Sequence, residues 1–265
     1  MNIFLLQYRD MPLKRMQPQA GFTLIELITV IVILSILATI GTGFVVKATE
    51  SYQRTQTRGL LVNTARQALE RMTRQLRVAL PYSVRITNSG SCIEFMPIAA
   101  GGNYLAPVPD SQNLAAATAT IAASPVVIDF GTPRYVTIGA MAATEVYGST
   151  AVSRAGYSSG NVVLTAPKSW QRNSVNKRFY LLDSPQAFCL VGSELRFYAD
   201  VPVENTNVTL TSSYSIVARN VSGANPFGLQ NGSENRQTQV AISLTFASDG
   251  ESLSYQQGVF IRNVP

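Results

Sequence analysis

The chain has 265 residues, of which 46% are hydrophobic and only 14% are charged, so the composition disfavours disorder and favours a membrane segment or a sparsely charged secreted domain. It has no histidine and two cysteines, which excludes Ser-His-Asp and Cys-His catalytic sites, imidazole-ligated metals and zinc or iron–sulfur clusters. The net charge of +6 is spread along the chain and is a weak argument for a nucleic-acid partner.

A basic leader precedes a long apolar run at the N-terminus. Residues 1–21 carry three basic side chains against one acid, and residues 22–46 carry a single charge, Glu26. As a helix the run spans about 37 Å, enough to cross a bilayer with the leader on the cytoplasmic side. A secretory signal has a shorter apolar region. A buried soluble helix and a plain membrane anchor also fit such a run, and the anchor explains everything except Glu26.

Glu26 is the unusual residue of this run. A carboxylate at the centre of a bilayer costs about 2.5–3.5 kcal/mol, and less near a helix end. A charge in such a place needs a partner. Cleavage between Gly21 and Phe22 would create an α-amino group at the head of the helix, in the same chain or a neighbouring one, and this amine is a candidate partner.

The hexapeptide Gly21-Phe22-Thr23-Leu24-Ile25-Glu26, between a basic leader and an apolar helix, resembles the class III signal of type IV prepilins. The resemblance implies that a prepilin peptidase removes residues 1–21 and N-methylates Phe22. It also implies that Glu26 pairs with the terminal amine of an adjacent subunit during assembly. The implied partners are this peptidase, other pilins of the same filament and the assembly platform of the inner membrane. The implied location is the bacterial inner membrane, crossed once with the C-terminal domain periplasmic, and then the pilus.

The helical pattern continues beyond the apolar run. Apolar residues recur at spacings of three and four from Leu61 to Ala79, and Pro81 cannot continue a helix, so one helix is expected from about Phe22 to Ala79. Gly41 and Gly43 weaken its middle, but without a proline there a stable kink is doubtful. The opposite face carries a row of arginines, interpreted as a solvated face or, alternatively, as contacts with headgroups, DNA or an acidic subunit: Arg54, Arg58, Arg66, Arg71, Arg74 and Arg77.

After Pro81 the sequence changes to short alternating runs rich in Ser, Thr, Ala, Gly and Val. We predict an α+β fold, in which a long N-terminal helix with a transmembrane first half packs on an antiparallel β-rich domain. The predicted segments are a cleaved leader, a membrane or filament-core half-helix, an amphipathic half-helix and a periplasmic or extracellular β-rich domain: 1–21, 22–46, 47–80 and 81–265. The predicted strands are 82–88, 91–97, 125–130, 134–138, 161–165, 178–183, 187–191, 194–199, 213–218, 239–247 and 258–263.

Connections in this domain have their own signals. Gly192-Ser193 and Asp249-Gly250 indicate two-residue hairpin turns. Residues 111–124 are of low complexity and are expected to form a short helix or a loop, and residues 148–160 and 222–237 are expected to be surface loops.

The two cysteines and the acids complete the site predictions. Cys92 and Cys189 are expected to form a structural disulfide outside the cytoplasm, although two buried free thiols are the alternative. No catalytic group, cofactor or metal is predicted, and the chain is not expected to be an enzyme; a loop calcium site at Asp200 and Glu204 is a minor alternative. Trp170 is expected in the core or at its rim.

Size and two further stretches suggest a subtype. Removal of the leader would leave 244 residues (265 − 21), which is large for a major pilin and suggests a minor, tip-located subunit. Residues 65–86 and the ending 258–265 resemble MshO-type minor pilins of mannose-sensitive haemagglutinin (MSHA) pili, a group related to the J-type pseudopilins of type II secretion and to W-type minor pilins. The expected function is a minor pilin of an MSHA-like type IV pilus that primes, caps or modifies the fibre. The alternatives are a type II secretion pseudopilin and an adhesin or DNA-uptake subunit.

Overall fold

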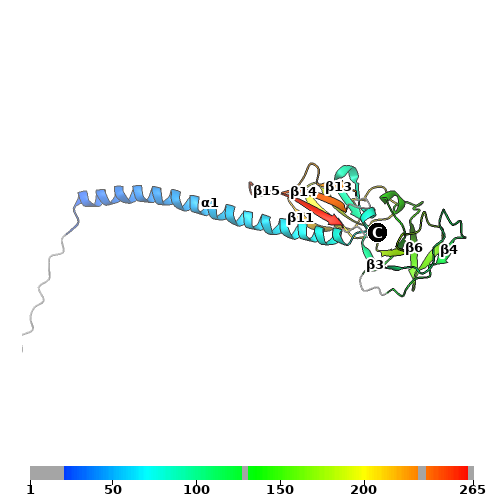
Figure 1. Ribbon diagram of the computed structural model, residues 1–265. Coiled ribbons are helices and arrows are strands. Elements are labelled where there is room, and N and C mark those ends of the chain that lie inside the picture. Colours follow the sequence, from blue (N-terminus) through cyan, green and yellow to red (C-terminus); the bar gives the residue numbers. More distant parts are fainter. Residues whose placement is uncertain (1–20, 127–130, 232–236, 262–265) are drawn as a thin grey trace, which may run out of the picture. The chain divides into compact units, whose positions relative to one another are not determined.

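The computed structural model describes residues 21–126, 131–231 and 237–261. The chain forms two compact units, residues 1–53 and 54–265, each of which is described by itself. One α-helix, α1 (Leu24–Arg77), holds the described helical residues of the first unit and continues into the second (Figure 1). The predicted helix over residues 22–79 is therefore confirmed to within two residues at each end.

Strands are the most common regular structure among the described residues of the second unit, as predicted. They are β1 (Arg85–Thr87), β2 (Cys92–Phe95), β3 (Ile98–Asn103), β4 (Thr118–Thr120), β5 (Tyr135–Thr137), β6 (Arg154–Ser159), β7 (Val163–Lys168), β8 (Arg178–Leu182), β9 (Gln186–Val191), β10 (Glu194–Tyr198), β11 (Ser215–Arg219), β12 (Val221–Ser222), β13 (Phe227–Gln230), β14 (Thr238–Ser248) and β15 (Glu251–Ile261). Short 3₁₀ turns lie at η1 (Pro81–Ser83), η2 (Asn88–Gly90) and η3 (Ala143–Glu145).

These strands form three sheets. The first has the order β1-β2-β9-β10-β11, and the second has β14 at its centre, with β12 and β13 on one side and β15 on the other. The third has the order β3-β8-β5-β6-β7-β4. Every ladder between these strands is antiparallel, so the predicted α+β architecture is confirmed.

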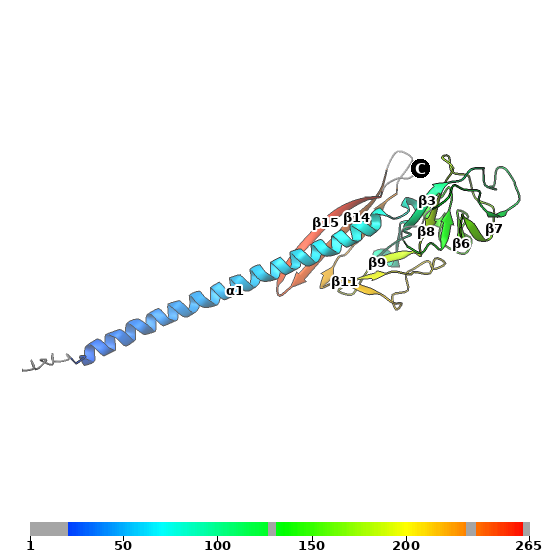
Figure 2. The same ribbon diagram turned by 90° about the horizontal axis from the view of Figure 1, so that it is seen from below.

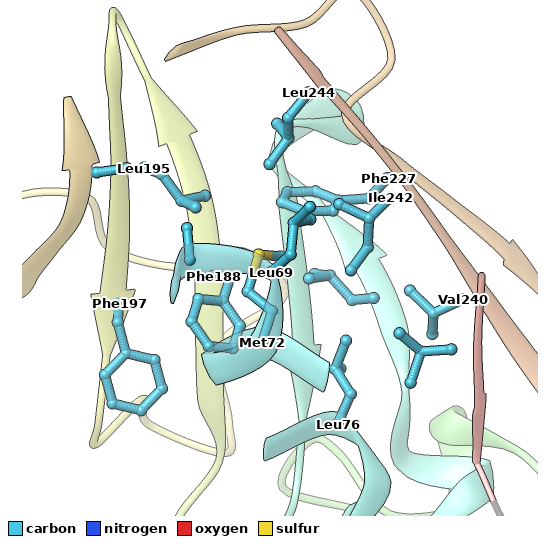
Figure 3. Packing of buried hydrophobic residues seen from close by; sticks show 14 of the residues in the cluster. Leu69, Met72, Leu76, Phe188, Leu195, Phe197, Phe227, Val240, Ile242 and Leu244 are labelled. Atoms are coloured by element: carbon cyan, nitrogen blue, oxygen red, sulfur yellow. The ribbon is translucent and has the colours of Figure 1, made fainter. Parts of the chain in front are cut away.

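The C-terminal half of α1 packs against the first two sheets because its apolar residues recur at helical spacing. Figure 2 shows β11 and β15 on either side of this half of the helix. The predicted apolar face is buried as expected, and Met72 and Leu76 are fully enclosed. In Figure 3 Met72 lies beside Phe188 of β9, and this core continues to Val240 and Ile242 of β14. In this half of α1 the face that the apolar spacing predicts is therefore the face that the sheets bury.

A second core lies on the third sheet. Val136 of β5 and Phe179 and Leu181 of β8 are fully buried in it. Trp170 is 2% exposed in the same core, so its predicted core position is confirmed.

Both predicted hairpin turns are present. Gly192 and Ser193 connect β9 to β10, and Asp249 and Gly250 connect β14 to β15. Gly192 has φ +60°, while Asp249 and Gly250 have φ +49° and +79°. Positive φ at both central residues is the requirement of a type I′ turn, which explains why an Asp-Gly pair occupies the second hairpin.

Several local predictions were wrong. Residues 148–160, expected to be a surface loop, contain β6, and residues 222–237 contain β13. Sheet pairing explains both errors, because β6 lies between β5 and β7 and β13 pairs with β14. Likewise β4 occurs inside the low-complexity tract 111–124, expected to be helix or loop.

Other differences concern strand extents. β3 was not predicted, and β15 begins at Glu251, well before the predicted strand 258–263. Of the predicted strand 125–130, residues 127–130 lie outside the described residues, as do residues 262 and 263 of the last predicted strand.

Candidate functional site

The helix start is built by the residues of the predicted signal. Gly21, Phe22 and Thr23 precede α1, and the Glu26 backbone N–H donates to Thr23 Oγ1 at 3.4 Å. The Leu27 N–H donates to the Thr23 carbonyl at 3.2 Å. Thr23 therefore caps the helix, and the Thr-x-x-Glu spacing is that of a capping box. The sequence prediction missed this role of Thr23, although the spacing was visible.

Hydroxyl groups along the apolar run are bound to their own helix. Thr29 Oγ1 donates to the Glu26 carbonyl at 2.9 Å and Ser35 Oγ to the Ile31 carbonyl at 2.7 Å. Thr39 and Thr42 bind carbonyl groups three and four residues earlier in the same way. Such local bonds satisfy a hydroxyl without a partner from another element. The helical segment formed by the apolar run therefore presents an apolar surface despite these polar residues.

Glu26 differs from these residues. Within the described part of the chain its carboxylate makes no hydrogen bond or ion pair, although its backbone groups are bonded. It lies in the first turn, where the helix dipole favours a negative charge. A carboxylate at this position can accept an ionic partner from outside the segment.

None of the apolar side chains in residues 21–53, the described part of the first unit, is buried. Phe22 is 80% exposed and Val46 51%, and the large apolar residues between them are exposed as well. The 18-residue apolar window of α1 has a mean hydropathy of 2.6 and lies wholly at the surface. This length and composition suit a membrane span, and a contiguous apolar surface of this extent needs lipid or other helices as surroundings.

The two glycines of the run do not interrupt the helix. Gly41 and Gly43 both lie inside α1, which is continuous there. An added Cβ at either would meet nothing within 4 Å. The expectation that a stable kink is doubtful therefore agrees with the helix seen here.

The arginine row of α1 is partly engaged with the domain. Arg58 Nε lies 2.6 Å from Glu251 Oε2 of β15, and Arg71 stacks over the Phe197 ring at 4.9 Å while donating to Ser215. Because these contacts lie at the surface, each contributes little to stability. Most of the row is exposed and makes local packing contacts only, which fits a solvated face.

A buried ion pair in the first sheet was not foreseen. Arg85 donates to both carboxylate oxygens of Glu94 at 3.0 and 3.1 Å, and to the Asn205 carbonyl at 2.6 Å. Its guanidinium also lies 3.7 Å from the centre of the Tyr147 ring. Burial raises the pKa of Glu94 to about 7, against the opposing effect of Arg85. This group connects β1 and β2 to two loops, which is a structural role.

The two cysteines are joined. Cys92 of β2 and Cys189 of β9 form a disulfide and are both fully buried. They are directly opposite one another in the antiparallel ladder. The bond is therefore part of the sheet interior, away from solvent.

The acidic residues that the structure describes do not form a metal site. No three His, Cys, Asp or Glu side chains of the described residues gather closely enough to hold a metal ion. Asp200 and Glu204, the minor calcium alternative, lie beside different arginines, Arg134 at 3.7 Å and Arg154 at 3.2 Å. We take the helix start, where Glu26 lies in the first turn of an exposed apolar segment, as the candidate site.

Comparison with known proteins agrees with this choice. A family model described as the prokaryotic N-terminal methylation motif matches residues 16–42, which include Gly21, Phe22 and Glu26. No curated protein and no solved structure matches the chain. The match and the long apolar helix near the N-terminus support a membrane-anchored, type IV pilin-like chain, and such a motif implies processing by a prepilin peptidase and assembly with other pilins.

Proposed function

We propose that this chain is a minor pilin that is cut between Gly21 and Phe22, N-methylated on Phe22 and assembled into an MSHA-like type IV pilus. The observation that carries the proposal is the methylation motif at residues 16–42, placed at the head of a helix whose N-terminal apolar stretch is wholly exposed. A plain membrane anchor needs neither this motif nor an unpaired carboxylate.

Glu26 has a specific part in the proposed assembly. Cleavage after Gly21 frees the amine of Phe22, four residues before Glu26 in the chain. In a neighbouring copy or another pilin this amine neutralises the carboxylate, which is costly to leave unpaired in lipid. Assembly is then favoured over free diffusion of single subunits in the membrane.

The minor role follows from size. The mature chain would have 244 residues (265 − 21), and a domain of that size, with several hydrophobic clusters, is bulky for every position of a thin fibre. A subunit that primes, caps or modifies the fibre avoids this crowding. Before assembly the proposed location is the inner membrane, with residues 81–265 in the periplasm, where the disulfide of Cys92 and Cys189 persists.

The N-terminal mass of the protein isolated from its host tests the proposal. We expect a chain that begins at methylated Phe22, and a Gly21→Glu variant that retains residues 1–21 and stays out of filaments. A Gly21→Ala variant, which adds only a methyl group at the cut site, is the control. A native protein that begins at Met1, or an uncleaved variant that enters filaments normally, contradicts the proposal.

The resemblance of residues 65–86 and 258–265 to MSHA-type minor pilins supports the choice of a pilus. The same processing serves type II secretion pseudopilins, and the deletion phenotype separates the two. Loss of surface filaments with normal secretion is expected for the pilus role. Loss of secretion with normal filaments identifies a pseudopilin. An adhesin or DNA-uptake role predicts normal filaments with lost binding.

A further inference from the structure

Strand β15 leaves one of its edges open. It pairs with β14 over its whole length, from Ser248↔Glu251 to Thr238↔Ile261, without a register shift. The other neighbours of β14, which are β12 and β13, lie on the side away from β15. Among the strands of the described residues, β14 alone pairs with β15.

The register shows which backbone groups face the open edge. The Ser243 N–H donates to the Pro226 carbonyl at 2.9 Å, away from β15. Ser243 is opposite Gln256 in the ladder. In an antiparallel ladder the backbone N–H and C=O groups of two opposed residues either all point toward each other or all point away. The Gln256 N–H and C=O therefore point away from β14. By alternation the same holds along the strand for Ser252, Ser254, Gly258 and Phe260.

Other sheet edges of the described domain are short or irregular. β1 and β4 have three residues each, and the ladders of β3 and β11 contain register shifts. β15 has 11 residues and a continuous ladder. Proteins protect exposed edges with bulges, prolines or lysines, and β15 contains none of these. Its one charge, Glu251, lies at its first residue and is paired with Arg58.

The hydrophobic core is less complete along the first half of β15, whereas Val259 and Ile261 in its second half are buried. Ile242, Leu244 and Phe246 of β14 are at most 1% exposed, whereas Leu253 and Tyr255 of β15 are only partly buried. The solvent-facing residues of the strand before Phe260 are short or uncharged: Ser252, Ser254, Gln256 and Gly258. An added strand would meet open hydrogen-bonding groups, no charge barrier and apolar surface to cover.

We propose that the open edge of β15 binds an extended, uncharged segment of a neighbouring pilin-like subunit as an additional antiparallel strand. This inference rests on the proposed function, because anchored subunits that assemble side by side present their domains to one another at high effective concentration. Main-chain hydrogen bonds supply the affinity in this mode of binding, and the alternating side chains supply the selectivity.

A proline at the centre of the edge tests the proposal in the full chain in its host. Gln256→Pro removes an outward N–H but no bond to β14, which is the situation in which sheets tolerate proline. We expect the amount of this variant in sheared filaments to fall about tenfold, since one added-strand bond is lost and its partner is left unpaired. Gln256→Ala, which keeps the N–H, is the matched control and should assemble normally. Both variants should retain the disulfide and wild-type protease resistance.

Hydrogen exchange of the wild-type chain decides the matter even if the proline variant misfolds. The outward amides of residues 252–260 should exchange quickly in detergent and become protected in filaments. Unprotected edge amides in filaments, or normal assembly of a folded Gln256→Pro variant, overturn the edge proposal. Either result can occur in a chain that begins at methylated Phe22, in which case the proposed function stands. An unprocessed chain contradicts the proposed function instead.

Discussion

Cys92 and Cys189 lie directly opposite one another on β2 and β9, with their Cα atoms 4.1 Å apart. The next pair in this ladder, Ile93 and Phe188, belongs to the core beneath α1. Because a slip of one residue would turn these side chains to the other face of the sheet, the disulfide fixes the register that builds the core. Its structural role is thus to hold the surface on which the helix packs.

Removal of the disulfide should destabilise the domain strongly. The bond closes a separation of 97 residues. The chain-entropy model therefore predicts a loss of about 4–5 kcal/mol in the free energy of unfolding of a Cys92→Ala/Cys189→Ala variant. Denaturant unfolding of the detergent-solubilised full chain measures this loss, with the reduced wild type as control. A loss below about 1 kcal/mol would show that the fold does not depend on the bond.

Glu26 should matter for assembly and not for processing. We expect Glu26→Gln, which keeps the shape and removes the charge, to be cut and methylated at Phe22 as the wild type is. Its amount in filaments should fall at least about tenfold, because hydrogen bonds to charged groups contribute about 1.5–3 kcal/mol. Glu26→Asp keeps the charge and serves as the control. Mass spectrometry of the N-terminus and quantification of sheared filaments check both parts, and normal assembly of the Gln variant would exclude a role for the charge.

Thr23 should stabilise the first turn of α1. Its hydroxyl accepts from the Glu26 N–H, so Thr23→Ala should weaken the helix start by about 1 kcal/mol, while Thr23→Ser keeps the cap. Amide exchange at Glu26 and Leu27 in detergent micelles should be about fivefold faster in the Ala variant. Equal exchange in the Ala and Ser variants is the contrary result.

The buried Glu94 should make stability depend on pH. Its pKa is raised from 4.5 to about 7 in the folded chain, so the folded state holds its proton more tightly than the unfolded state. Stability from this group is therefore full below about pH 4.5 and is lost as the pH rises toward 7, at up to about 1.4 kcal/mol per pH unit. A Glu94→Gln variant should lack this slope. Thermal unfolding between pH 4.5 and 7.5 measures it, and equal slopes in both proteins contradict the assignment.

The turn before β15 requires a glycine. Gly250 has φ +79° with no atom within 4 Å of an added Cβ, so Gly250→Ala introduces backbone strain without a steric clash. We expect a loss of about 1 kcal/mol in the free energy of unfolding. Asp249→Asn, at φ +49°, should be nearly neutral because asparagine tolerates this conformation. Denaturant midpoints of the two variants give the comparison, and an equal effect of both would argue against strain.

Much of the fold could be predicted because strong local signals agreed with the tertiary structure. The apolar face from Leu61 to Leu76 has helical spacing, and its residues are those that the sheets bury. Pro81 marks the end of the helix, and the Asp249-Gly250 and Gly192-Ser193 pairs mark hairpins that are present. The first turn of the candidate site was also visible, since the signal hexapeptide contains the residues of the cap.

The missed strands have weak local signals and depend on pairing. β6 contains glycine and serine and is held between β5 and β7. β3 contains Gly101 and Gly102, where an added Cβ would lie 3.0 Å from the Tyr180 ring and 2.9 Å from the Phe179 ring. Glycine in a strand is then a sign of close approach by a neighbour, which a single sequence does not reveal. The pairing of Arg85 with Glu94 depends in the same way on the register of β1 and β2.

The hydroxyls of the apolar run have a consequence for how such rods would associate. The hydroxyls of Ser35, Thr39 and Thr42 each donate to a carbonyl of their own helix. After the first turn, the apolar run up to residue 46 therefore presents no unpaired polar side chain. Two apolar helices of this kind can shift relative to one another along their axes with little change in energy. Among the described polar residues of the apolar run, Glu26 is the one whose side chain has no partner within the helix, so in the proposed assembly we expect it to set the axial step between neighbouring helices.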